Sequence, residues 1–234
     1  MLDISGLQVL YEDNHLIAVN KPGGWLVQGD KTGDIPLSEF VKQYIKVRYK
    51  KPGDVFLGVV HRLDRPVSGV VVFARTSKAL TRMNKLFQDR KVDKTYWAIT
   101  NKTPEPLEGE LVHYLAKHTG RNVTTAYTSP KMIEKKKAKK SVLKYKMIGR
   151  LGGHVLIQVH PITGRSHQIR VQLAEIGCPI RGDLKYGFSR WNEDSNINLH
   201  CREMSFVHPV KKERVTITAD PKRDSVWLVF NQYF

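Results

Sequence analysis

The sequence has few cysteines and no long apolar run. Cys178 and Cys201 are the only cysteines in 234 residues, and neither belongs to a close-spaced group of cysteine or histidine. This argues against a disulfide framework, and no metal site is expected. No stretch approaches the roughly 18 apolar residues of a membrane-spanning helix. The N-terminus contains Asp3 and lacks the basic and then apolar pattern of a signal peptide, so we expect a cytoplasmic protein with no membrane partner.

Negative charge is also scarce. Aspartate and glutamate number 22 against 39 lysines and arginines, which gives a formal net charge of +17. Such an excess predicts a long-range positive field that attracts polyanions, and nucleic acid is the expected partner. The chain lacks a glycine-rich phosphate loop, a dinucleotide fingerprint and metal-ligand spacing, so no cofactor is expected. With 41% hydrophobic residues, it can bury a sizeable core in one domain.

The most informative stretch runs from His61 to Gly69, with the sequence HRLDRPVSG. A β-branched run at residues 70–74 follows at once and predicts a buried strand, which places Asp64 on the tight loop entering the sheet. An arginine partner would favour the ionised form of a buried carboxylate, as a nucleophilic carboxylate requires. Taken alone, this pattern is more often a turn in which the aspartate caps a backbone amide.

A second block decides between these alternatives. It comprises PITGRSHQIRV at residues 161–171 and GCPIRGD at residues 177–183, followed by Tyr186 and Gly187. These residues resemble a signature block of the RluA-type RNA pseudouridine synthases, and His-Arg-Leu-Asp-x-x-x-Ser-Gly resembles the catalytic-loop signature of that family. Three further blocks fall in the family order: Asn20-Lys21-Pro22-x-Gly24, Lys94-Thr95-Tyr96, and Leu199-His200 with Phe206-x-His208-Pro209.

The resemblance implies a reaction and three catalytic residues. The family isomerises specific uridines of structured RNA to pseudouridine, with a flipped-out base and no cofactor. Asp64 would be the nucleophile, and Tyr96 would stack on the target base and serve in proton transfer. Arg165, at a predicted strand-to-helix junction, would pair with Asp64. Arg170 is the second candidate for that pairing, with a structural role as its alternative.

The resemblance also implies residues that bind the substrate. Arg62 would occupy the position that the flipped base leaves, and Leu63 would belong to an apolar floor. Lys21 would meet RNA phosphate or the catalytic loop; the alternative is an exposed lysine in a turn. The remaining substrate-binding candidates are His61, Lys94, Ile169 and Arg170.

Periodicity and turn signals predict the other elements. A helix is expected from Ser38 to Lys50, and a second from an N-cap at Ser77 to Arg90. Lysine is concentrated in residues 131–146, which we expect to begin as a mobile loop and to become a strand near Ser141. This run either contacts phosphate or is a solvated, disordered loop. The other expected strands and helices cover residues 7–11, 16–20, 95–100, 109–117, 122–128, 154–160, 166–176, 199–207, 214–219 and 226–234.

We therefore expect an α+β protein with a long, mixed, mainly antiparallel central sheet flanked by helices and loops, the pseudouridine synthase fold. Residues 1–234 would form a single pseudouridine synthase catalytic domain without a separate N-terminal RNA-binding domain. The chain departs from the family pattern at Val67, where threonine is usual, and at Pro66, where glutamate is common. The lost hydroxyl at Val67 would remove a backbone-capping bond but not the nucleophile.

Two functions of other classes compete with this prediction. A non-catalytic RNA-binding or ribosome-assembly factor on the same fold would need no ionised carboxylate facing RNA. A glycoside hydrolase usually needs a second carboxylate, and none is evident as a partner for Asp64. We expect an enzyme acting on ribosomal or transfer RNA, and a monomer.

Overall fold

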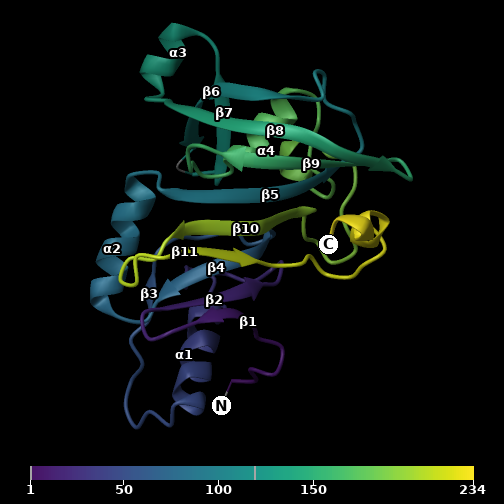
Figure 1. Ribbon diagram of the computed structural model, residues 1–234. Coiled ribbons are helices and arrows are strands. Elements are labelled where there is room, and N and C mark those ends of the chain that lie inside the picture. Colours follow the sequence, from purple (N-terminus) through teal and green to yellow (C-terminus); the bar gives the residue numbers. More distant parts are fainter. Residues whose placement is uncertain (1, 119) are drawn as a thin grey trace. The chain divides into compact units, whose positions relative to one another are not determined.

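The structure is a computed structural model that describes residues 2–118 and 120–234 (Figure 1). The chain forms two compact units, each described by itself. The first contains residues up to Asp93 and Cys201–Pro221, and the second contains Lys94–His200 and Lys222–Phe234. The prediction of a single catalytic domain concerns the chain as a whole and stays a prediction.

The first unit is built on a sheet in which β1, β2, β4 and β10 are neighbours in that order, with β3 beside β4 and β11 beside β10. The pairing of β2 with β4 is antiparallel and sets Lys21 opposite Gly69. This register brings the end of β2 to the start of β4, where the chain leaves the predicted catalytic loop. The bounds are β1 (Gln8–Glu12), β2 (Leu16–Lys21), β3 (Gly58–Val59), β4 (Ser68–Ala74), β10 (Leu199–Val207, from Cys201 onward in this unit) and β11 (Arg214–Thr218).

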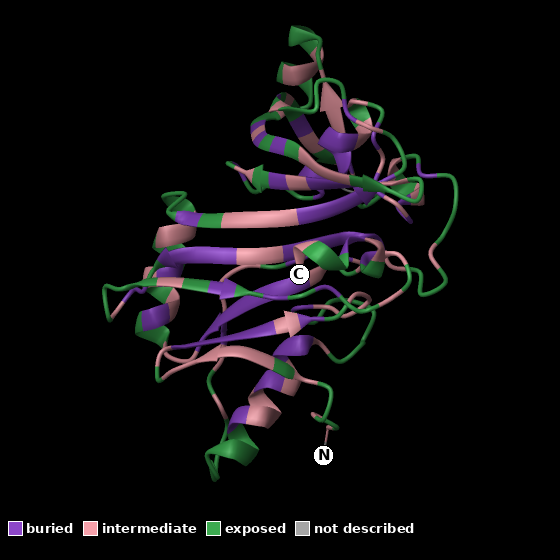
Figure 2. Cartoon of the chain, turned by 45° about the vertical axis from the view of Figure 1, so that its right-hand side comes forward, coloured by how far each residue is buried: buried purple, intermediate pink, exposed green. Residues whose placement is uncertain are grey.

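The core of this unit lies around β2 and β4, whose central residues are buried (Figure 2). A continuous apolar strand is typical of a sheet that is covered on both faces. The helices of the unit are α1 (Leu37–Arg48) and α2 (Ser77–Gln88). The N-cap of α2 is Thr76, whose hydroxyl accepts a hydrogen bond from the Ala79 amide at 3.1 Å. The predicted cap at Ser77 was wrong by one residue, because Thr76 has the extended backbone that a capping side chain needs.

In the second unit, the strands follow the order β5, β9, β8, β6, β7, and each neighbouring pair is antiparallel. Short helices accompany these strands. The bounds are β5 (Val92–Thr100, from Lys94 onward in this unit), β6 (Glu108–His118), β7 (Val123–Tyr127), α3 (Pro130–Lys135), β8 (Lys139–Leu151), β9 (His154–Pro161), α4 (Gln168–Glu175), η1 (Leu184–Tyr186) and η2 (Trp227–Tyr233).

The lysine-rich segment differs from the prediction. Residues 130–135 form α3, where a mobile loop was expected, and β8 begins at Lys139. Proline at the first helical position is preorganised for a helix, and lysine is itself a good helix former, so local propensity outweighs the repulsion between the charges. Lys137 turns the chain between α3 and β8 with a φ of 50°. The predicted strand near Ser141 is confirmed.

The α+β class and the mainly antiparallel sheet are confirmed by these two units. The elements expected at residues 109–117 and 122–128 are present as β6 and β7, which pair as a hairpin with Lys117 opposite Thr124. The C-terminal segment buries Trp227 and Phe230 in a cluster with Trp97 of the same unit, as an amphipathic segment should. Within residues 2–118 and 120–234, no helix is both long and apolar enough to cross a membrane.

At Gly69, the backbone of β4 closely approaches the backbone of β10. Its φ is +115°, and a Cβ added there would lie 2.3 Å from the carbonyl oxygen of Cys201. We expect Gly69→Ala to lower the free energy of unfolding by roughly 3 kcal/mol, because a methyl group meets backbone atoms that cannot move aside. Urea unfolding of the purified variant measures this loss. Gly6→Ala is the matched control, since nothing lies within 4 Å of a Cβ added at Gly6; equal losses in the two variants would contradict the close approach.

Candidate functional site

The predicted catalytic loop is a tight turn directly before β4. The Val67 amide donates to the Asp64 carbonyl at 3.0 Å, which closes the turn through the backbone. Val67 therefore closes the turn through its backbone amide, without the side-chain hydroxyl that family members usually have at this position. The Asp64 side chain is half-buried, Arg62 is exposed, and Leu63 is buried. The exposure of Arg62 agrees with its predicted role of filling the position that the flipped base leaves in the RNA. The burial of Leu63 agrees with its predicted place in an apolar floor.

His61 anchors the first residue of this loop. Its Nε2 accepts a hydrogen bond from the Val72 amide at 3.0 Å, and its ring stacks on Phe87 with centroids 5.1 Å apart. The acceptor role places the proton of a neutral ring on Nδ1. These contacts hold the loop against β4 and α2, which is a structural role that the motif did not indicate. Neither contact bears on substrate binding by His61, which stays a prediction.

Lys21 holds the same loop through hydrogen bonds. The side chain is 0% exposed, and its Nζ donates to the carbonyl oxygens of Pro22 (2.9 Å), Trp25 (2.8 Å) and Arg65 (3.0 Å). Of the alternatives for Lys21, contact with the catalytic loop is therefore the one observed. The predicted phosphate contact and the exposed turn lysine are both wrong, because the ammonium is enclosed and already bonded to three acceptors.

Burial also changes the acidity of this lysine. Removal from water lowers the pKa of Lys21 to about 7, the charge of Asp64 opposes that fall, and the charge of Arg65 adds to it. Lys21 and Asp64 thus lie within electrostatic range of each other. The protonation of a group that holds the loop is sensitive to pH near neutrality.

Arg65 fastens the loop to the segment that follows β2. The Gly24 amide donates to the Arg65 carbonyl at 2.8 Å, and Arg65 Nε donates to the Gly24 carbonyl at 2.9 Å. Its Nη1 lies 2.7 Å from Oδ2 of Asp34. Two hydrogen bonds to the Gly24 backbone and one ion pair therefore restrain the residue directly after Asp64, and preorganisation of this kind is what a reactive carboxylate requires.

In the second unit, Gln168 holds the turn that carries Arg165. Its Oε1 accepts from the Arg165 amide (3.0 Å) and from the Thr163 hydroxyl (2.7 Å), while its Nε2 donates to the Val142 carbonyl (3.1 Å). The Arg165 side chain itself is exposed. Sequence reasoning missed Gln168; an amide side chain at the first turn of a helix, three residues after the candidate arginine, was the available signal.

Lys94 and Tyr96 lie on β5, and Lys94 reaches the same turn. A Cβ added to Gly164 would lie 4.0 Å from Lys94 Nζ, so Lys94 and the Arg165 turn are brought together. Tyr96 is half-buried opposite Val159 of β9. The roles of Tyr96 at the base, of Lys94 at the substrate, and of Arg165 beside Asp64 stay predictions.

The other two predicted residues of this block are buried. Arg170 donates from Nε and Nη2 to the two carboxylate oxygens of Asp183, at 2.7 and 2.8 Å. The side chains of Arg170 and Asp183 are 5% and 1% exposed. This two-point pair supports the structural alternative for Arg170. Ile169 is buried as well. The roles of Ile169 and Arg170 at the substrate, and of Arg170 as the second candidate to pair with Asp64, stay predictions.

Lys21 generates a prediction about pH. The unfolded chain binds a proton at lysine up to about pH 10.5, whereas the folded protein releases it near pH 7, so the stability contributed by this group rises with pH between those values. Relative to Lys21→Met, the wild-type free energy of unfolding should rise by about 2 kcal/mol from pH 7 to pH 9. Urea unfolding at both pH values measures the difference. Lys140→Met, at an exposed position, is the control, and a flat difference for Lys21→Met would refute the buried, shifted lysine.

The pair between Arg170 and Asp183 generates a second prediction. Asp183→Asn removes the carboxylate charge opposite the buried Arg170 guanidinium and should lower the free energy of unfolding by roughly 3 to 5 kcal/mol. The double variant Arg170→Met with Asp183→Leu should recover much of that loss, because both charges of this pair are removed together. Chemical denaturation of the three proteins tests this. A single variant as stable as wild type would show that the pair contributes nothing.

Comparison with known proteins agrees with this arrangement. The family model described as RNA pseudouridylate synthase matches residues 15–175. The chain is 31% identical over 219 residues to Ribosomal large subunit pseudouridine synthase C of Buchnera aphidicola, covering 90% of this chain and 66% of that protein. It is also 31% identical to tRNA pseudouridine synthase C of Vibrio parahaemolyticus, covering 94% of this chain and 92% of that one. The chain thus spans just under two thirds of the first relative and most of the second.

A solved structure shares the fold. Human RNA Pseudouridylate Synthase Domain Containing 4 superimposes with a TM-score of 0.75 at 24% identity, covering 92% of this chain and 89% of that chain. The family match includes the predicted catalytic loop at residues 61–69 and the Arg165 turn, where the structure holds exposed or half-buried charged groups on restrained backbone. The resemblance identified from the motifs is confirmed, and the chain belongs to the RNA pseudouridine synthases of the RluA type.

Proposed function

We propose that this protein converts uridine to pseudouridine in structured RNA, with Asp64 as the catalytic carboxylate. The observation that carries the proposal is the half-buried Asp64 on a turn that Lys21 and Arg65 restrain, in a chain that belongs to this family. The reaction breaks the bond between ribose C1′ and uracil N1 and joins C1′ to uracil C5. The proton of C5 is lost to solvent and N1 gains one, so no redox partner is needed.

Asp64 acts on the ribose in one of two ways. Its carboxylate either adds to the anomeric carbon or abstracts a ribose proton, and both routes need the ionised form. The target base must first leave the helical stack, at a cost on the order of a few kcal/mol that is smaller for a loop nucleotide. Arg62 takes the vacated position, and the apolar side chain of Leu63 helps to keep water from the detached base.

Tyr96 and Arg165 complete the proposed catalytic set. Tyr96 stacks on the uracil through its half-buried ring and serves in proton transfer. Arg165, which has no carboxylate partner among the described residues, pairs with Asp64 once RNA is bound and keeps it ionised and oriented, which a guanidinium achieves better than an ammonium because of its planar, two-point geometry. Gln168 acts through Arg165, since it holds the backbone amide of that residue and is a positioning residue.

The substrate class follows from the relatives. One relative is named for ribosomal RNA of the large subunit and another for transfer RNA, and we propose that this chain acts on one of these two classes. The formal charge of +17 suits either polyanion. We further propose that the protein works as a monomer in the cytoplasm.

Tritium release tests the reaction. With bulk cellular RNA labelled at uracil C5, the wild-type protein should release tritium, and Asp64→Asn should release it at least roughly 10³-fold more slowly, because the amide cannot act as a nucleophile. The affinity of each protein for the same RNA is measured in parallel. Asp54→Asn, at an exposed aspartate of the same unit, is the control and should keep its activity.

The outcomes separate the candidate functions. Activity that depends on Asp64 supports the synthase. Tight RNA binding without release by the wild-type protein would contradict the catalytic proposal and favour the non-catalytic RNA-binding factor. Equal release by wild type and Asp64→Asn would remove Asp64 from the reaction.

A further inference from the structure

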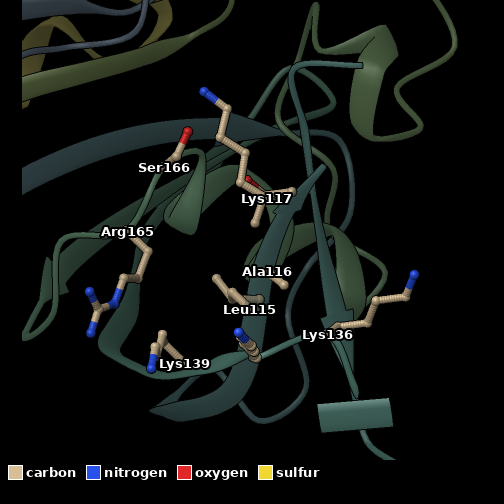
Figure 3. Close-up of a pocket in the computed structure, with 9 residues that line it drawn as sticks. Leu115, Ala116, Lys117, Lys136, Lys139, Arg165 and Ser166 are labelled. Carbon is tan, nitrogen blue, oxygen red and sulfur yellow. The ribbon is translucent and has the colours of Figure 1, made fainter. Parts of the chain in front are cut away.

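A basic pocket lies beside the Arg165 turn, wholly within the second unit (Figure 3). Its volume is about 260 Å³. The wall comes from four elements: β6, β7, the turn from α3 into β8, and the turn before α4. The lining residues are Leu115, Ala116, Lys117, Thr124, Lys136, Lys137, Lys139, Arg165 and Ser166.

The strand register explains why these side chains meet. Lys117 lies opposite Thr124 of β7, and Leu115 lies opposite Lys139 of β8. Leu115 and Lys117 are two residues apart, so all four side chains project from one face of the sheet. The turn that carries Arg165 and Ser166 closes the pocket over this face. In Figure 3 the charged ends of Arg165 and Lys139 lie on the same side of the pocket, whereas Lys117 and Lys136 extend away from them.

The charge of the pocket is not neutralised within the protein. Five of its lining residues are cationic, and none of the five has a carboxylate partner in the described ranges 2–118 and 120–234. Lys146 of the same lysine-rich segment, outside the pocket, does pair with Glu108 at 2.8 Å. Clustered like charges repel one another, so the pocket is most stable when an anion occupies it.

Thr124 provides an independent sign of a ligand. Its side chain is 3% exposed, and its Oγ1 is a buried atom without a hydrogen-bond partner. A buried hydroxyl left unsatisfied costs about 1 to 3 kcal/mol, and such groups are rare in folded proteins. An acceptor oxygen inside the pocket would remove that cost, directly or through one ordered water.

A hydrogen-bonded brace, made by Tyr186 and His167, also holds the pocket wall in place. The Thr124 amide donates to the hydroxyl of Tyr186 at 2.9 Å, and the same hydroxyl lies 2.6 Å from Nδ1 of His167. His167 adopts a left-handed backbone with a φ of 54° directly after Ser166. Burial raises the pKa of Tyr186, which keeps its hydroxyl protonated as a donor. The brace joins β7 to the start of α4 and holds the two sides of the pocket at a set separation.

We propose that this pocket binds a backbone phosphate of the RNA substrate, with Arg165, Lys139 and Thr124 as its ligands. A phosphate offers several acceptor oxygens to the guanidinium, the ammonium and the hydroxyl, and its negative charge matches the cations. Because Arg165 stands both in this pocket and among the proposed catalytic residues, a phosphate held here sets the RNA strand against the reacting group. The identity of the polyanion rests on the proposed function; the phosphate site itself does not.

Binding of a small probe tests the site directly. Isotope-labelled protein is titrated with uridine 5′-monophosphate and, separately, with uridine at low salt, and amide shifts are followed by NMR. The monophosphate should shift the amides of Thr124 and Ser166, and uridine alone should not. Shifts spread evenly over the lysines outside the pocket would overturn the proposal, as would equal shifts with the two probes.

Matched variants sharpen the test. Lys139→Gln and Thr124→Val should each weaken binding of the monophosphate, the first by about tenfold because a charge-assisted bond is lost. Lys140→Gln removes the same charge from the neighbouring exposed position, whose side chain points to the opposite face of β8. It should leave the affinity within about twofold of wild type. Equal losses in Lys139→Gln and Lys140→Gln would show a diffuse field and no site.

Activity on RNA provides a separate readout. In the tritium assay with bulk RNA, Lys139→Gln should raise KM and lower the slope of log affinity against log salt by about 0.7 to 0.9, as the loss of one phosphate contact predicts. Lys140→Gln should change neither by as much. Tritium release without monophosphate shifts at Thr124 and Ser166 would refute the pocket alone, whereas those shifts without any release would refute the proposed function alone.

Discussion

The loop that carries Asp64 depends on one buried lysine. Lys21 ends β2 opposite the first glycine of β4, and its three hydrogen bonds satisfy carbonyl oxygens on both segments that surround Asp64. An unsatisfied buried carbonyl costs about 1 to 3 kcal/mol, so loss of this donor would penalise the observed conformation at the Pro22 and Trp25 carbonyls. The backbone that carries Asp64 is thus stabilised by a buried lysine.

The second unit also restrains the backbone beside a charged residue, but it does so with different side chains. Gln168 uses both ends of its amide to hold the Arg165 turn against β8, and the ion pair between Arg170 and Asp183 secures the helix that follows. In both units, a buried and hydrogen-bonded side chain restrains the backbone next to an exposed or half-buried charged group. Rigid support of this kind lets electrostatic groups act without reorganisation during the reaction.

The lysine-rich segment contributes to the basic pocket beside the Arg165 turn. It forms a short helix and a strand, and it presents Lys139 to a pocket that Arg165 shares. Contacts to phosphate orient an RNA strand and do not read its bases. The choice of uridine must therefore come from the shape of the RNA and from groups around the flipped base.

Local patterns were enough for much of the fold and for the family. The apolar run at residues 70–74, the hairpin of β6 and β7, and the catalytic motif around Asp64 are all readable in the sequence, because periodicity and motif spacing are local properties. The helix at residues 130–135 was missed because charge repulsion was weighed above helix propensity. Only the tertiary structure decided that Lys21 is buried, that Gln168 holds Arg165, and that Thr124 and Lys139 share a pocket. Those features join residues far apart in the chain, and burial and hydrogen-bond partners exist only once strands pair in register.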